Sequence, residues 1–375
     1  MTRSKGKTPD RLTDDGLGEY ATRTTAKEVV EYFDLSNDRW AGGRVSSWVF
    51  RGVRLESYDL RPSAWRPKVI SHNTWRPTRL LAREYAKRWI ALNKPDGFKK
   101  YPDLAKALPE GNAKKQEQHL LGLVEQIRWE QLLQRRFVQL ADELGFNVGG
   151  SFAQEHEQEY PPFTAKLVTP YPKQATAFAQ HHHIPTRLLD WTRSPLKSLF
   201  FAAEGNLKKP LPQTSFAVWA LNVRYLACLE TVYRGDYDQW DKLGVFHMYA
   251  QKAGHGFLQA QDGLFTWIHG WEKPYLKSLE FPDLPQALKA LHAVGNATGC
   301  GKQFEGEPIL RKLTAPARLV PELLRLLELQ QITKCRLMPT LDNIAETLRM
   351  EAMLPATPQW IPEAQPMEWR GIGRL

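Results

Sequence analysis

The sequence is short of cysteine and has no long apolar run. Its three cysteines, Cys228, Cys300 and Cys335, lie far apart and never in a CxxC spacing. This pattern predicts neither a disulfide framework nor a zinc ribbon, and it fits a reducing compartment. No stretch approaches the ~18 apolar residues of a membrane-spanning helix, and the basic start lacks the apolar core of a secretory signal. We therefore expect a cytoplasmic protein that does not enter the membrane.

The glycine motifs of common nucleotide sites are also absent. Neither GxGxxG nor GxxxxGKS occurs in the chain, so a Rossmann or P-loop site is not supported. Strand-like and helix-like segments follow one another without a regular strand–helix–strand rhythm, which favours a mixed α+β fold. Strands are expected at residues 46–53, 215–223 and 309–314, and two short ones in 256–267 around a turn at Asp262 and Gly263. Helices are expected at 25–33, from about Thr78, at 115–144, at 173–182, from Pro195 to a stop at Gly205, and twice within 321–350, the last beginning at Thr340.

Basic residues outnumber acidic ones, and their excess is concentrated. The chain carries 51 Lys and Arg against 41 Asp and Glu, a formal charge of +10. Residues 61–100 hold eleven basic and two acidic residues, which is nearly the whole surplus. The helix from Thr78 is expected to turn its basic side chains outward, where they are either simply solvated or meet a polyanion such as RNA or DNA. The basic face comprises Arg79, Arg83 and Lys87, and the opposite, core-facing side comprises Leu81, Tyr85, Trp89 and Leu92.

An acidic residue interrupts the apolar side of the helix expected at 115–144. Glu130 falls in a stripe of Leu, Ile and Phe residues spaced three and four apart. A carboxylate on a buried face is costly unless a cation or several donors meet it, and an arginine is the expected partner. Glu130 is therefore either a structural clamp on a functional arginine or a functional acid itself.

The densest polar segment of the sequence is His181–Pro195, just before a helix. Ser194 is placed to cap that helix and Pro195 to occupy its first turn. We interpret this segment as a polar loop that ends at a helix N-terminus, where free N–H groups favour an anion. The three adjacent histidines, His181–His183, point in different directions, so no metal site is expected.

Four segments resemble the FRG domain, named for a Phe-Arg-Gly motif that is here Phe50, Arg51 and Gly52. They are WVFRGVRLESYDLRPSAWRP, AQHHHIPTRLLDWTRSPLKSLFFA, QDGLFT and LLELQQITKCRLMPTLDNIAETL. His182 and His183 stand where the family more often has an aromatic residue and a glycine, and Asp262 replaces a usual polar amide. The resemblance implies an FRG domain at 41–350 with a basic helical insertion at about 61–145. A loosely held polar lead-in at 1–40 and a tail at 351–375 flank it.

A weaker resemblance links the same motifs to ADP-ribosyltransferases of the arginine-serine-glutamate type. It implies a mixed sheet core of that type with several flanking helices, and NAD as substrate. Arg51 and Gly52 would hold the NAD phosphates, and the Asp190–Ser194 segment would brace the nicotinamide ribose. Gln261 stands in the place of the glutamate of the third motif.

The resemblance assigns roles that each have a structural alternative. Arg51 and Arg187 would clamp the diphosphate, and Thr192 and Ser194 would supply the ribose hydroxyl contact. Asp190, Glu130 or Gln261 would face the ribose, and His181 would bind a ribose hydroxyl or take a proton from the acceptor. Alternatively, Arg51 pairs with Glu130, Arg187 pairs with Asp190, and Thr192 only caps a helix.

Two functions from different classes are consistent with these residues. The first is an ADP-ribosyltransferase-like enzyme that uses NAD to modify a macromolecular acceptor such as RNA or DNA. Similar families imply a toxin or antiphage effector, with an antitoxin or chaperone as partner. The second is a non-catalytic nucleic-acid-binding or phosphate-binding effector module in which the same arginines grip a phosphate.

Overall fold

One mixed β-sheet organises the part of the chain that the structure describes. This computed structural model describes residues 10–12, 17–40, 47–94, 106–110, 112–148, 174–208, 213–235, 242–249, 263–296, 299–304 and 306–354. Within these ranges the strand order is β1-β2-β8-β5-β3-β4-β7-β6, with β2 and β8 parallel and the other neighbours antiparallel. The strands are β1 (Arg11–Leu12), β2 (Gly18–Thr22), β3 (Trp48–Val53), β4 (Leu188–Thr192), β5 (Ser215–Asn222), β6 (Gly244–Met248), β7 (Gly263–His269) and β8 (Leu310–Pro316). The mixed α+β class is confirmed.

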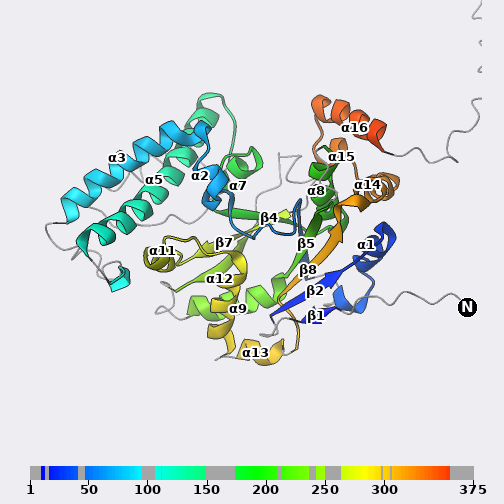
Figure 1. Ribbon diagram of the computed structural model, residues 1–375, viewed down its shortest axis with the longest axis horizontal. Helices are drawn as coiled ribbons and strands as arrows, with labels where there is room; N and C mark the ends of the chain where they lie inside the picture. The colour runs from blue at the N-terminus through cyan, green and yellow to red at the C-terminus, as the bar shows by residue number, and fades with distance from the viewer. Residues whose placement is uncertain are drawn as a thin grey trace, which may run out of the picture.

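Helices cover both faces of this sheet and build a separate core on each. Successive side chains of a strand point to opposite faces. Val49 and Val53 of β3 accordingly join one core, and Trp48 and Phe50 join the other. The helices of the Phe50 side are α1 (Ala26–Tyr32), α8 (Pro195–Lys208), α14 (Val320–Leu329), α15 (Lys334–Leu337) and α16 (Leu341–Met353), grouped together in Figure 1. The other side has α7 (Gln174–His181), α9 (Val223–Gly235), α11 (Glu272–Ser278), α12 (Leu284–Asn296) and α13 (Gly299–Gln303).

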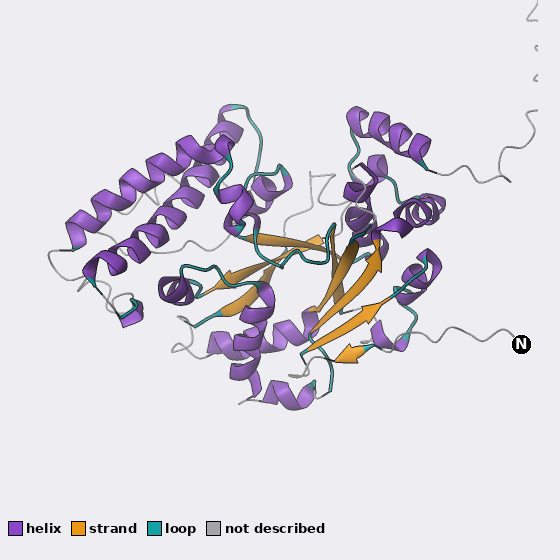
Figure 2. Ribbon diagram, in the orientation of Figure 1, coloured by secondary structure: helices purple, strands orange, loops and turns teal. Residues whose placement is uncertain are grey.

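The sheet splits between β3 and β4. β3 pairs with β5 over its whole length but meets β4 only at Phe50 and Thr192. Figure 1 shows β4 and β7 running across the direction of β5 and β8, and the same change of direction is visible in the orange strands of Figure 2. Beyond the one shared pair, the facing backbone groups of β3 and β4 need other partners.

A helical hairpin projects to one side of the sheet (Figure 1). It consists of α3 (Arg76–Asn93) and α5 (Ala113–Glu143), with the short α2 (Pro67–Ile70) before it. The expected apolar face of α3 is partly wrong, since Leu81 is 64% exposed and Leu92 58% exposed. Instead, α3 buries the small Ala82 and Ala86 beside Trp89, because small side chains let the two helix axes approach closely.

Several other sequence expectations need correction. Residues 17–40 are not a loosely held lead-in, since β2 pairs with β8 and α1 buries Val29 in the core. Gly205 does not stop α8, which continues to Lys208. Leu188–Thr192 is a strand rather than a loop. Gln261, Asp262 and the first of the two strands expected in 256–267 lie outside the described residues, as does Ser46. The Pro-rich stretch 160–172, which the sequence predicts to be a loop, also lies entirely outside them.

The expectation of no disulfide is wrong. Cys228 of α9 and Cys300 of α13 form a disulfide with a Cα–Cα distance of 6.0 Å, across a sequence separation of 72 residues. Cys335 is a free cysteine. The disulfide ties α9, which packs against β6, to α13.

Candidate functional site

Arg51 bridges the split between β3 and β4. Its Nη1 lies 2.8 Å from the backbone carbonyl oxygen of Asp190 and 2.8 Å from Asp190 Oδ1. The Arg51 side chain is 11% exposed and that of Asp190 is 52% exposed. The Nε of Arg51 is buried and, within the described residues, has no hydrogen-bond partner. Arg51 therefore donates a hydrogen bond to a backbone carbonyl group of β4, and its Nε remains a buried donor without a partner among the described residues.

A polar network holds the Asp190 carboxylate in place from α7. Gln180 Nε2 donates to Asp190 Oδ1 over 3.1 Å. The Oε1 of the same amide accepts hydrogen bonds from Thr186 Oγ1 at 2.6 Å and from Ser63 Oγ at 3.3 Å. Ser63 Oγ also accepts from the backbone N–H of Thr186. The amide orientation of Gln180 is thereby fixed, which fixes the carboxylate that it binds.

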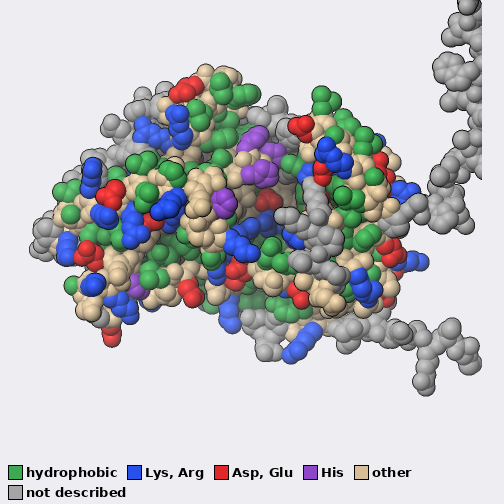
Figure 3. Space-filling model, turned by 45° about the horizontal axis from the view of Figure 1, so that its top comes forward, with side chains coloured by type: hydrophobic (Ala, Val, Ile, Leu, Met, Phe, Trp, Pro, Cys, Tyr) green, Lys and Arg blue, Asp and Glu red, His purple; other side chains and the backbone are tan. Residues whose placement is uncertain are grey.

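Electrostatics keep Asp190 ionised and His181 neutral near pH 7. Partial desolvation raises the pKa of Asp190, but the Arg51 charge and the hydrogen bonds from Arg51 and Gln180 outweigh it and lower that pKa to about 2. Burial lowers the pKa of His181, with smaller contributions from His182 and His183, while Asp190 opposes the change. Figure 3 shows histidine side chains grouped near the middle of one face, close to basic and acidic side chains. The site thus combines a fixed negative group, a guanidinium and an imidazole able to accept a proton.

Glu130 is a structural clamp on Arg187. Glu130 Oε2 lies 2.7 Å from Arg187 Nε, and both side chains are at least nine-tenths buried. Its Oε1 accepts hydrogen bonds from Trp65 Nε1 at 3.0 Å and from Gln126 Nε2 at 2.8 Å. An arginine partner for Glu130 was expected, and this partner is Arg187. The alternative in which Arg51 pairs with Glu130 and Arg187 with Asp190 is wrong, since Arg51 pairs with Asp190.

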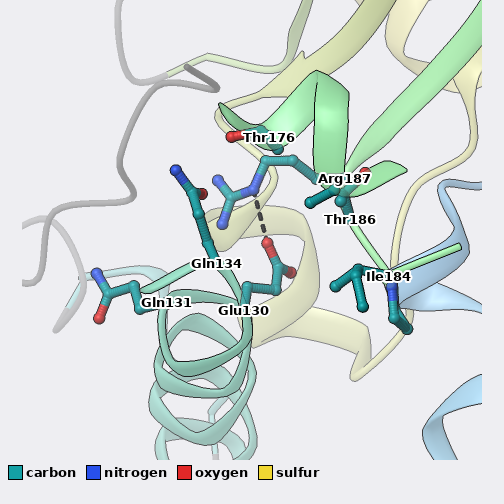
Figure 4. A pocket seen from close by; sticks show the side chains of 9 residues that line it. Glu130, Gln131, Gln134, Thr176, Ile184, Thr186 and Arg187 are labelled. Atoms are coloured by element: carbon teal, nitrogen blue, oxygen red, sulfur yellow. Dashed lines mark hydrogen bonds and ion pairs between the residues drawn. The ribbon is translucent and has the colours of Figure 1, made fainter. Parts of the chain in front are cut away.

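A small cavity adjoins this clamp. Figure 4 shows the Arg187 guanidinium beside Glu130, with Gln134 and Thr176 close to it. The cavity measures about 20 Å³, which is room for roughly one water molecule. A diphosphate cannot enter this space, so Arg187 in this arrangement is not the expected diphosphate clamp.

Gly52 lies in close contact with α8. A Cβ on Gly52 would collide with the Ser198 carbonyl oxygen and lie 2.7 Å from the backbone nitrogen of Ala202. Both atoms belong to α8, which therefore sits directly against β3 at this point. These contacts explain the glycine by packing alone, and its expected role in holding the NAD phosphates stays a prediction.

Thr192 and Ser194 form the start of α8. Thr192 Oγ1 accepts from the backbone N–H of Ser194 at 3.2 Å, and Ser194 Oγ accepts from that of Lys197 at 3.3 Å. Ser194 is the expected cap, and two donors that could have met an anion are already satisfied. The capping alternative is therefore the one that these contacts favour for both residues.

The three basic residues singled out on α3 do not form one outward stripe. Arg79 points inward, where it bonds Glu125 at 2.8 Å and stacks on Trp129. Arg83 and Lys87 are each 54% exposed, and Lys87 pairs with Glu84 at 2.6 Å. Arg79 therefore helps to join α3 to α5, and of these three residues Arg83 and Lys87 are exposed on the surface.

The sequence interpretation missed Gln180 and Ser63, which form the network under Asp190. The signal for Gln180 was its place beside His181 in the polar segment. No local pattern marked Ser63, because it reaches the site only through its tertiary contacts with Gln180 and Thr186.

Metal and membrane features were searched in the same described ranges. No group of three or more His, Cys, Asp or Glu side chains is placed there to hold a metal ion. No helix of those ranges has both the length and the apolar character to cross a membrane.

Comparison with known protein families supports the motif resemblance. The FRG domain matches residues 150–210, whose described part contains α7, β4 and α8. This match covers the segment that supplies Gln180, His181 and Asp190. Searches of curated proteins and of solved structures find no match.

Proposed function

We propose that the chain is an ADP-ribosyltransferase-like enzyme that uses NAD, with its site where β3 and β4 diverge. The observation that carries this proposal is the contact between Arg51 and Asp190. It joins the expected phosphate-binding arginine to the polar segment expected to face the ribose. The proposal includes a mixed sheet core of the ADP-ribosyltransferase type.

The reaction requires a negative group and a proton acceptor. Cleavage of the nicotinamide–ribose bond releases neutral nicotinamide and leaves an oxocarbenium-like carbon, which an acceptor hydroxyl or amine attacks. The ionised, half-exposed Asp190 carboxylate is suited to stabilise that positive charge. His181, neutral near pH 7, is suited to take the proton that the acceptor loses. In this proposal Gln261 also faces the nicotinamide ribose, in the place of the glutamate of the third motif.

A direct test uses NAD labelled on its adenylate phosphate. Wild-type protein is incubated with RNA, DNA or a protein lysate, and both labelled macromolecules and released nicotinamide are measured. We expect Asp190→Asn to lower the transfer rate by about 100-fold or more, since it removes a charge aimed at the transition state. Arg349→Gln, which alters an exposed arginine paired with Glu346, is the matched control and should not change the rate. Absence of nicotinamide release by wild type with every acceptor would reject the proposal.

A non-catalytic nucleic-acid-binding module is the second candidate. The exposed Arg83 and Lys87 on α3 favour it, together with the basic character of residues 61–100. In that case nucleic acid should bind without nicotinamide release, and its affinity should fall steeply with salt. Charge reversal at Arg83 and Lys87 should flatten this salt dependence, and an unchanged slope would remove this surface from consideration.

A further inference from the structure

The helix α16 has an apolar face that stays exposed in the described part of the chain. Leu341 is 85% exposed, Leu348 61% and Ile344 49%. Ala345 and Ala352 are exposed on the same face. These five residues are here called the α16 stripe. Contiguous exposed apolar side chains commonly mark an interaction surface, so the stripe needs an occupant.

The opposite face of α16 attaches the helix to the rest of the protein. Met350 is buried in the core on its side of the sheet. Thr347 Oγ1 accepts a hydrogen bond from the backbone N–H of Cys335 over 3.0 Å, and Asn343 Nδ2 donates to the Met338 carbonyl oxygen over 2.7 Å. Figure 1 shows α16 at the outer end of its group of helices. One face of α16 is therefore used within the chain, and the stripe points outward.

The spacing of the stripe suits packing against another helix. Its members Leu341, Ala345, Leu348 and Ala352 are separated by four, three and four residues. This is the d, a, d, a spacing of a coiled-coil seam. Alanine at alternate positions lets two helix axes approach closely, and leucine fills the remaining space. Met350 takes position f, on the far side from the seam, so a partner helix leaves its buried contacts intact.

A second copy of α16 complements the stripe when the two helices run antiparallel. When Leu348 of one copy lies level with Ala345 of the other, twofold symmetry also places Leu341 level with Ala352. Each leucine then packs beside an alanine along the whole seam, which leaves neither a clash of large side chains nor a gap between small ones.

The charges beside the seam favour the same arrangement. Asp342 and Arg349 both take position e, and in an antiparallel pair the e positions of the two copies face each other. In the register above, Asp342 of one copy and Arg349 of the other are offset by about 3 Å along the axis, within reach of the long arginine side chain. On the other flank Glu351 faces Ile344, so no like charges meet. In a parallel pair Arg349 would face Ile344 instead, and no ion pair would form.

We infer that the chain forms an antiparallel homodimer through the α16 stripe. Two ion pairs between Asp342 and Arg349 flank the apolar seam, one at each end. The helix has 13 residues and is about 20 Å long, so the interface falls below the ~800 Å² per partner of a stable complex. The dimer is therefore weak, and it forms in the micromolar range of protein concentration. This inference does not depend on the proposed function.

Sedimentation-velocity centrifugation of the full chain between about 1 and 100 μM measures the association. The mass of wild type should rise with concentration from 43.1 kDa toward twice that value. Leu348→Glu should raise the Kd by about tenfold or more, because each dimer would bury two unpaired carboxylates. The matched control is Leu81→Glu on α3, where a leucine is 64% exposed outside the stripe, and its Kd should equal that of wild type.

A mixture of two charge variants tests the antiparallel pairing. Asp342→Arg and Arg349→Asp should each raise the Kd of self-association by about threefold or more, since like charges then face each other. Mixing the two variants should restore association, because every facing pair in the mixed dimer has opposite charges. Circular dichroism confirms that each variant is folded, and if Leu348→Glu does not fold, Leu341→Glu replaces it.

Three results would overturn the inference. The first is a wild-type protein that stays monomeric throughout, which leaves the stripe to a different occupant, either residues 355–375 of the same chain or another protein. The second is a Kd that Leu348→Glu does not change, or that Leu81→Glu changes as much. The third is a mixture of the two charge variants that associates no better than each variant alone.

Discussion

Replacing Glu130 with glutamine tests the assignment of this residue as a clamp. The carboxylate accepts three hydrogen bonds, from Trp65, Gln126 and Arg187, in a position that is 9% exposed. Glutamine has almost the same shape but carries no charge. Its NH₂ group replaces one of the two accepting oxygens, so at least one of the three N–H donors would lose its acceptor. Arg187, itself 5% exposed, would then hold a buried charge without a partner.

The expected cost follows from this loss of the counter-charge. Removing one partner of a buried ion pair typically costs about 3–5 kcal/mol, far more than the pair itself contributes relative to apolar groups. We expect urea unfolding of Glu130→Gln to give a free energy of unfolding lower by about 3–5 kcal/mol. The double variant Glu130→Leu with Arg187→Met should recover much of that loss, since it removes both charges and keeps apolar volume.

The control is a matched substitution on the neighbouring helix. Glu84→Gln removes an exposed carboxylate paired with Lys87, and its unfolding curve should coincide with that of wild type. If Glu130→Gln is as stable as wild type, the carboxylate does not neutralise Arg187 and the clamp assignment is wrong. Full stability with lost activity would instead make Glu130 a functional acid.

Three further predictions concern the pH dependence, the packing and the disulfide. The pKa of Asp190 is lowered in the folded state, so the stabilising effect of its carboxylate should be present above pH 4 and disappear as the pH falls toward 2. In acid unfolding curves, Asp190→Asn should abolish this pH-dependent stabilisation, which amounts to only about 1 kcal/mol because the side chain is half exposed. Gly52→Ala should lower the free energy of unfolding by about 3 kcal/mol or prevent folding, since its Cβ collides with α8. Cys228→Ser should cost about 2–5 kcal/mol under oxidising conditions and nothing in excess reductant, because the bond to Cys300 closes a long loop.

Each of these predictions has a contradicting result. An acid unfolding curve of Asp190→Asn that matches wild type from neutral pH down to pH 2 would mean that Arg51 does not depress the pKa of Asp190. A fully stable Gly52→Ala would mean that α8 does not press on β3. Equal stability of Cys228→Ser and Cys335→Ser in the absence of reductant would mean that the disulfide does not stabilise the fold, since Cys335 is a free thiol.

Local sequence patterns predicted most elements whose apolar spacing is regular. The helix α5 and the strands β3, β5 and β8 lie where periodicity placed them, and Thr340 caps α16 as expected. Such features depend on neighbours within a few residues, so the sequence alone contains the information. The strand β4 was taken for a loop because Asp190 and Thr192 interrupt a very short apolar run.

Pairings between distant residues were not accessible in the same way. The buried position of Glu130 required a cation, but the choice between Arg51 and Arg187 depends on how β4 is threaded beside α5. The inward orientation of Arg79 depends on Glu125 of the facing helix. The bond between Cys228 and Cys300 likewise depends on tertiary structure and not on a local spacing.

A crystal structure of the protein soaked with NAD tests the central claim most directly. The account predicts that the diphosphate lies within hydrogen-bond distance of Arg51, with the nicotinamide ribose beside the Asp190 carboxylate. NAD bound elsewhere, for instance against Arg83 and Lys87 on α3, or no bound NAD in well-ordered crystals at saturating ligand, would contradict it.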